Sequence, residues 1–133
     1  MSNSNTIKEK KNEEKFKVVA EIGTIVHPDG RRFQVTVLGH TLKGRAATSQ
    51  ESLYALTVRS ATLLGQLGLD LLTEQGLLEK LPKGFWYNSF EAGNHHRVPR
   101  LHTYLSGGDG LSLGRFGYEW DNYGQLVCFV EVK

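Results

Sequence analysis

A stretch of alternating apolar residues, interrupted by a four-residue turn, constrains the fold of this chain most. Apolar residues occupy every second position from Phe16 to Ile22 and again from Phe33 to Val37, which is the period of a half-buried strand. Between the two runs lies His27-Pro28-Asp29-Gly30. Proline presets its φ, aspartate bonds nearby backbone and glycine accepts a positive φ. The stretch predicts a β-hairpin, with Arg31 and Arg32 at its tip or just beyond.

The middle of the chain has the period of a helix instead. Thr48 and Glu51 have the spacing of a capping box, which marks a helix start. Leucines then recur at helical spacing, at positions Leu53, Leu56, Leu64, Leu67 and Leu71. We expect one long helix from Ser49 to about Gln75. Gly65 and Gly68 either allow a neighbouring backbone to approach this helix closely or mark a break in it.

Aromatic and β-branched residues dominate the last third of the chain. Four segments have strand composition, namely residues 85–90, 99–105, 111–120 and 125–132, and residues 121–124 have turn composition. The order of elements predicts an α+β fold. We expect an N-terminal β-hairpin, the long helix, and three or four C-terminal strands. Together they would form a mainly antiparallel sheet with the helix packed on one face.

Length and composition bound the domain organisation and the class of protein. The chain has 133 residues and a formal net charge of +2, so we expect a single domain over residues 16–133. Residues 1–15 are too polar to be buried and predict a flexible charged tail. Cys128 is the single cysteine, which excludes an internal disulfide. With no apolar signal segment or membrane span in the sequence, we expect a cytoplasmic protein.

Histidines concentrate in the segment FEAGNHHRVPRLHTYLSGGDG, residues 90–110. His95, His96 and His102, with Glu91, are candidate ligands for a transition metal. His96 and His102 are also candidate general bases. Adjacent histidines in a strand point to opposite faces, however, and no established zinc or nucleophile motif surrounds them. The glycines at the end of the segment lack the lysine of a phosphate-binding loop and predict a turn. We therefore predict no metal and no cofactor, and keep a histidine-based enzyme or metal site as the alternative.

Arginines interleaved with aromatic residues give the leading functional hypothesis. Guanidinium groups fork onto phosphates, and aromatic rings stack on bases. We expect a non-enzymatic binding module whose basic and aromatic surface, between about residues 85 and 115, binds an anionic partner. The candidate ligand-binding residues are Trp86, His96, Arg97, Arg100, His102, Tyr104 and Arg115. The candidates for a secondary basic surface are Arg31, Arg32 and Arg45.

The anionic partner is either a phosphorylated small molecule or a nucleic acid. The small net charge favours a small molecule or a protein partner over a nucleic acid, because nucleic-acid binders carry a strongly basic stripe or patch. A further alternative is an accessory or inhibitor protein that binds a protein partner or forms a homo-oligomer. Its contact surface would be the apolar stretch from Leu69 to Leu81. We expect no interaction with membranes.

Overall fold

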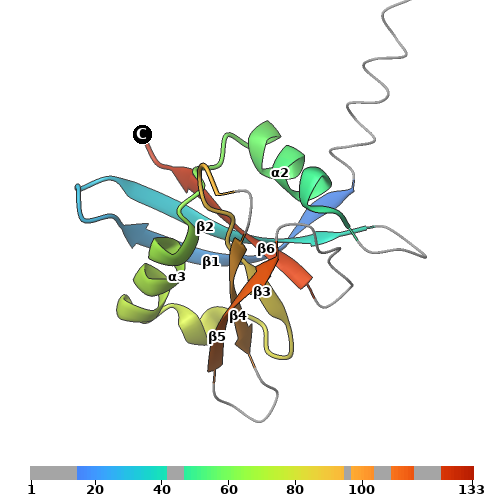
Figure 1. The fold of residues 1–133 in the computed structure, drawn as a ribbon. Helices are drawn as coiled ribbons and strands as arrows, with labels where there is room; N and C mark the ends of the chain where they lie inside the picture. Colours follow the sequence, from blue (N-terminus) through green and yellow to red (C-terminus); the bar gives the residue numbers. More distant parts are fainter. Residues whose placement is uncertain (1–14, 42–46, 95–96, 104–108, 116–123) are drawn as a thin grey trace, which may run out of the picture.

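The computed structural model describes residues 15–41, 47–94, 97–103, 109–115 and 124–133, with only the backbone for 109–115. The tail predicted for residues 1–15 therefore lies, except for its last residue, outside the described residues. The elements are β1 (Phe16–Val26), β2 (Arg32–His40), α2 (Ser49–Val58), α3 (Gly65–Glu74), a 3₁₀ turn (Leu78–Lys80), β3 (Trp86–Asn88), β4 (Arg97–Thr103), β5 (Asp109–Arg115) and β6 (Gly124–Glu131) (Figure 1). Within the described ranges, no helix has the length and apolar character needed to cross a membrane.

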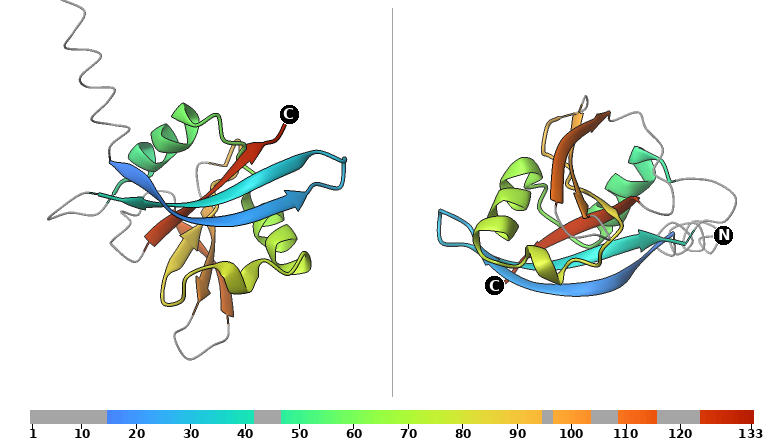
Figure 2. Two further views of the ribbon diagram at one scale, coloured as in Figure 1. Left: turned by 180° about the vertical axis from the view of Figure 1, so that it is seen from behind. Right: turned by 90° about the horizontal axis from the view of Figure 1, so that it is seen from below.

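The strands of the described ranges form one sheet with the order β1-β2-β6-β3-β4-β5. Neighbouring strands are antiparallel except for β3 and β6, which are parallel. The sheet is so strongly twisted that β4 and β5 run across the direction of β1 and β2 (Figure 2). An α+β fold with a mainly antiparallel sheet is therefore confirmed. The predicted strand over residues 111–120 is present as far as Arg115, and its remainder lies outside the described residues.

The predicted N-terminal hairpin is confirmed, together with the chemistry of its turn. The Asp29 carboxylate accepts a hydrogen bond from the backbone N–H of Arg31 at 2.9 Å. Gly30 has a φ of +94°, and its N–H donates to the carbonyl of His27 at 2.8 Å. Glycine adopts this conformation without the steric cost that a side chain would add. Local sequence thus determines where β1 ends and β2 begins.

The predicted helical region is present, but it consists of two shorter helices and not of one long helix. α2 ends at Val58 and α3 begins at Gly65. Ser60, between them, has a φ of +57°, which an L-residue in a helix does not adopt. The backbone N–H of Thr62 donates to the Phe129 carbonyl on β6 at 2.7 Å. The intervening segment therefore pairs with the sheet instead of continuing the helix.

The two helices pack on opposite faces of the sheet, which also corrects the expectation of a helix on one face only. Successive residues of a strand point to opposite faces. On β6, Val127 and Phe129 are in the buried cluster that contains the leucines of α3. Leu126 and Cys128 are in the second cluster, with Ala55 and Leu56 of α2. Both faces of the central strand are thus covered, each by a different helix.

The two glycines of the predicted long helix have different roles. Gly65 opens α3 with a φ of +59°, so the break occurs next to it. Gly68 lies inside α3, where an added Cβ would be 2.5 Å from Cζ of Phe129. No Cβ can occupy that space unless the ring moves, since real carbon contacts are about 3.5–4.0 Å. Gly68 therefore allows α3 to approach the sheet closely.

The apolar stretch from Leu69 to Leu81, which we considered as a contact surface for a partner, is largely buried within the chain. Leu69, Leu72 and Leu81 are each at most 1% exposed. Leu77 and Leu78 pack against the same cluster. These leucines therefore stabilise the fold, because they cover the face of the sheet next to α3.

The capping box at the start of α2 is present as predicted. The Thr48 hydroxyl accepts from the N–H of Glu51 at 3.1 Å, and the Glu51 carboxylate accepts from the N–H of Thr48 at 3.0 Å. We predict that Thr48→Ala lowers the free energy of unfolding by about 1 kcal/mol, the usual effect of losing a cap. Chemical denaturation measures this. Thr57→Ala, at an exposed position of the same helix, is the control, and an equal loss there would contradict a specific capping effect.

Candidate functional site

Three of the predicted site residues meet on one face of β3 and β4. Trp86 on β3 is the register partner of His102 on β4, and Asn88 is the partner of Arg100. Residues opposite each other in an antiparallel pair project to the same face. We call Trp86, Asn88, Arg100 and His102 the β3–β4 platform. It lies on the face that α2 covers farther along, because Val98 of β4 belongs to the cluster beneath α2.

Arg100 is held in place from two directions. Its Nε donates to Oδ1 of Asn88 at 3.2 Å, and its Cζ lies 4.1 Å from the ring centroid of Trp86. A guanidinium over an aromatic face is attracted by the electrons of the ring. Asn88 is fully buried and is itself fixed, because its Nδ2 donates to the Gln125 carbonyl on β6 at 3.2 Å. A half-buried arginine is thus oriented by a buried amide.

Glycines flank the aromatic pair of the platform. The Trp86 and His102 ring centroids lie 4.3 Å apart, with an angle of 44° between the ring planes. In register, Gly124 of β6 pairs with Trp86 and Gly110 of β5 pairs with His102. The row across these four strands therefore reads Gly124, Trp86, His102, Gly110. Each ring is half-buried and has beside it, on the strand away from its partner, a residue with no side chain.

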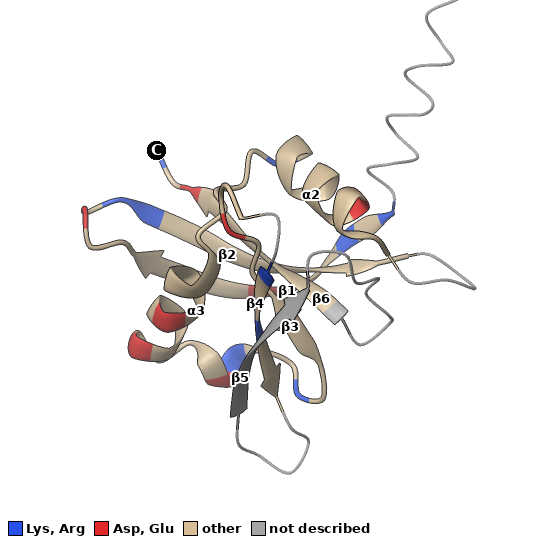
Figure 3. Cartoon of the chain, in the orientation of Figure 1, with Lys and Arg blue, Asp and Glu red and all other residues tan. Residues whose placement is uncertain are grey.

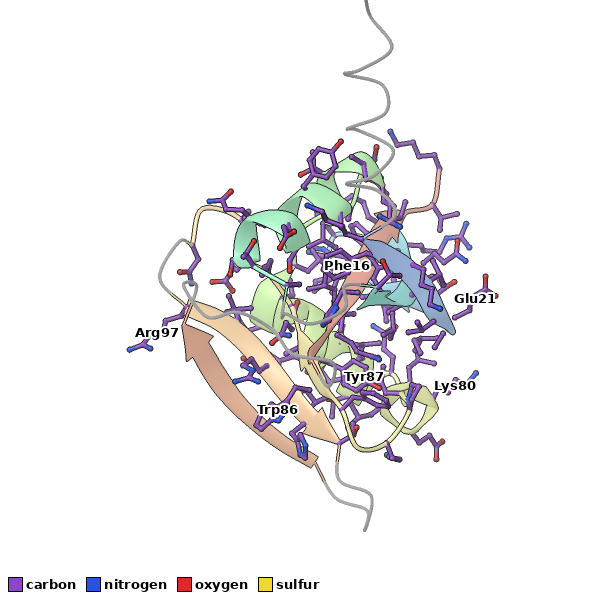
Figure 4. The ribbon with its side chains drawn as sticks, turned by 90° about the vertical axis from the view of Figure 1, so that its right-hand side faces the viewer. Phe16, Glu21, Lys80, Trp86, Tyr87 and Arg97 are labelled. Atoms are coloured by element: carbon purple, nitrogen blue, oxygen red, sulfur yellow. The ribbon has the colours of Figure 1, made fainter. Side chains whose placement is uncertain are left out.

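The structure does not bring the other predicted β4 and β5 arginines to this face. Arg97 lies three residues from Arg100 on β4, and positions separated by an odd number point to opposite faces. It is exposed and extends away from the body of the molecule (Figure 4). Arg115 is the register partner of Arg97, whereas Ser112 is the partner of Arg100. Of the three predicted arginines, the register therefore places only Arg100 in the rows that hold Trp86 and Asn88.

The secondary basic residues of the hairpin lie far from the platform. Arg32 is next to the C-terminal end of β6, since its carbonyl accepts from the N–H of Val132, whereas the platform lies beside Gly124 at the other end. At about 3.3 Å per residue, β6 separates the two regions by roughly 23 Å. Arg31 serves the turn, where its Nε lies 2.7 Å from the Asp29 carboxylate. Arg45 lies outside the described residues.

The structure describes only some of the residues proposed for a histidine-based enzyme or metal site. His95, His96 and Tyr104 lie outside the described residues. Glu91, which we considered as a metal ligand, lies beside the first turn of α3. The backbone N–H of Gln66 donates to its Oε2, with 3.4 Å between nitrogen and oxygen. Across the described ranges, no group of three potential ligands is close enough to hold a metal ion.

The comparisons add no relative. No protein-family model, no curated protein and no solved structure matches the chain.

Sequence reasoning missed Asn88, which positions the arginine. The signal was present, because Trp86 and Asn88 are two residues apart in a segment of strand composition and so share a face. Arg100 could be linked to them only through the register of β3 with β4. Cys128, the single cysteine, is 1% exposed. Burial raises the pKa of this thiol, which disfavours the reactive thiolate.

Negative charge gathers elsewhere on the molecule. Asp70 and Glu74 of α3 are exposed, as is Glu79 in the following 3₁₀ turn, and Figure 3 shows these acidic positions together on that side. α3 packs on one face of the sheet, and the platform is on the other. The sheet therefore separates the acidic side chains of α3 from Arg100.

Proposed function

We propose that this chain is a small cytoplasmic, non-enzymatic binding protein for a phosphorylated small molecule, with Arg100 as the contact to the phosphate. The observation that carries the proposal is the fixed guanidinium, held at 3.2 Å from Asn88 Oδ1 and at 4.1 Å from the Trp86 ring centroid. A planar guanidinium matches the oxygens of a phosphate in two parallel hydrogen bonds. Fixing it before binding reduces the entropy lost on association.

The distribution of basic residues favours a small ligand over a nucleic acid. Binding a polymer requires several cations along a track, each neutralising a phosphate. Among the described residues, Arg97 projects from the opposite face of β4 and Arg31 and Arg32 lie at the far end of β6. Arg100 is the described basic residue of the platform. A compact ligand with one phosphate group or a short phosphate chain fits this arrangement best.

Isothermal titration calorimetry of the full chain tests the proposal. The titrants are pyrophosphate, ADP and a single-stranded oligonucleotide, each at salt concentrations of about 50 and 200 mM. We expect pyrophosphate and ADP to bind, with an affinity that falls only weakly with salt because few phosphate contacts are made. If neither small anion binds at the lower salt concentration, the proposal is wrong. Steeply salt-dependent binding of the oligonucleotide alone would replace it with nucleic-acid binding.

A further inference from the structure

The row of residues across β6, β3, β4 and β5 is formed by Gly124, Trp86, His102 and Gly110. Its aromatic rings bear on the shape of the ligand as well as on its charge. Trp86 and His102 form an aromatic pair with centroids 4.3 Å apart. Arg100 lies over the same Trp86 ring. The positions flanking the pair in register are Gly124 and Gly110. Gly110 lies within β5, and Gly124 is the first residue of β6. A glycine inside a strand lacks a side chain to pack and often marks a place where a ligand approaches the backbone.

Resting on the proposed function, we infer that the ligand carries a flat ring next to its phosphate, as a nucleotide does. The ring stacks against the Trp86–His102 pair, over the backbone of β5 at Gly110, while the phosphate is bound by Arg100. Gly110 is the register partner of His102, and Ser112 is that of Arg100. The stacking region and the phosphate contact are thus adjacent rows of one face. Base–aromatic stacking contributes about 1–3 kcal/mol per base.

The test compares ligands that differ only in the ring. ADP carries a ring and a pyrophosphate, whereas pyrophosphate carries the charge alone. We expect ADP to bind the full chain roughly 5- to 150-fold more tightly than pyrophosphate, which is the stacking energy expressed as a ratio. Equal affinities for the two would overturn the inference on the ring while leaving the proposed function intact. Absence of binding by both would overturn the proposed function itself.

A substitution at Gly110 locates the ring. Gly110→Leu places a side chain beside His102 on the platform face, so we expect ADP affinity to fall to the level of pyrophosphate, whose own affinity is unchanged. Gly110→Ala is the matched control, because it removes the same backbone freedom with much less bulk and retains most of the ADP advantage. An unchanged ADP affinity in the leucine variant would contradict the placement.

Nuclear magnetic resonance provides a second measurement on the unmodified chain, which does not depend on the folding of a variant. The indole N–H resonance of Trp86 is identified by its loss in Trp86→Phe. We expect ADP to shift this resonance much more than pyrophosphate does. Identical shifts with the two ligands, or none with either, would show that no ring stacks there.

Discussion

Replacing Phe129 with alanine is expected to lower the free energy of unfolding by about 3–5 kcal/mol, the usual cost of truncating a buried phenylalanine. Phe129 is 1% exposed and lies on the central strand β6. Its ring fills the space beneath Gly68 of α3. Its carbonyl accepts from Thr62, in the segment that joins the two helices. Truncation removes contacts that hold α3 on the sheet, and chemical denaturation measures the loss.

Gly68→Ala tests the same contact between α3 and Phe129 from the side of the helix. In an open helix, alanine is more stable than glycine by about 1 kcal/mol. Here the added Cβ would be 2.5 Å from the Phe129 ring, so we expect a net loss of stability instead. Gly68→Ala and Phe129→Ala both act on the contact between these two residues. The double variant should therefore lose less stability than the sum of the losses in the two single variants. Additive losses, or a stabilising Gly68→Ala, would contradict the packing of α3 on β6.

Val132→Ala is the control for both substitutions. Val132 follows β6 and is 42% exposed, so its truncation should change the stability by less than about 0.5 kcal/mol, as is usual for surface positions. A large loss at Val132 would mean that β6 as a whole, and not the ring of Phe129, is sensitive to substitution.

Arg100→Lys is expected to weaken the binding of pyrophosphate and of ADP at least tenfold, and Arg100→Ala more. Lysine retains the positive charge but loses the planar fork, the hydrogen bond from Nε to Asn88 and the stacking on Trp86. Hydrogen bonds to charged groups are worth about 1.5–3 kcal/mol each, so the loss of one or two accounts for the size of the effect. Calorimetry measures it directly.

Arg97→Lys is the matched control, because Arg97 is on the same strand but projects from the other face. We expect its affinity for both ligands to equal that of the unmodified chain. If Arg97→Lys weakens binding as much as Arg100→Lys does, the loss does not depend on the contacts of Arg100 with Asn88 and Trp86. The fixed guanidinium of Arg100 would then have no special role.

The sequence predicted correctly those features whose interacting residues are close together in the chain. The turn at Asp29 and Gly30 and the capping box at Thr48 were correct because their partners lie within a few residues. The prediction of one continuous helix was incorrect because the leucines of α2 and α3 follow one helical period, although the two helices pack on different faces of the sheet. Nothing in the spacing of the leucines indicates that Thr62 pairs with Phe129 across 67 positions.

The candidate site was predicted in its residue types but not in its arrangement. Trp86, Arg100 and His102 converge, whereas Arg97, another of the candidate residues, does not join them. Counting along β4 places the two arginines on opposite faces once that segment is known to be a regular strand. The role of Asn88 depends on the register between β3 and β4, which is a contact between distant segments. Such contacts follow from the packing of the whole sheet.

The most direct test of the proposed site is the resonance of the Arg100 Nε–Hε group in a proton–nitrogen correlation spectrum, identified by its loss in Arg100→Lys. This N–H is the donor to Asn88 and reports on the guanidinium itself. During a titration with ADP, we expect this resonance to shift and to saturate with the dissociation constant found by calorimetry, while that of Arg97 stays in place. An Arg100 resonance that does not move while ADP binds would contradict the proposed phosphate contact.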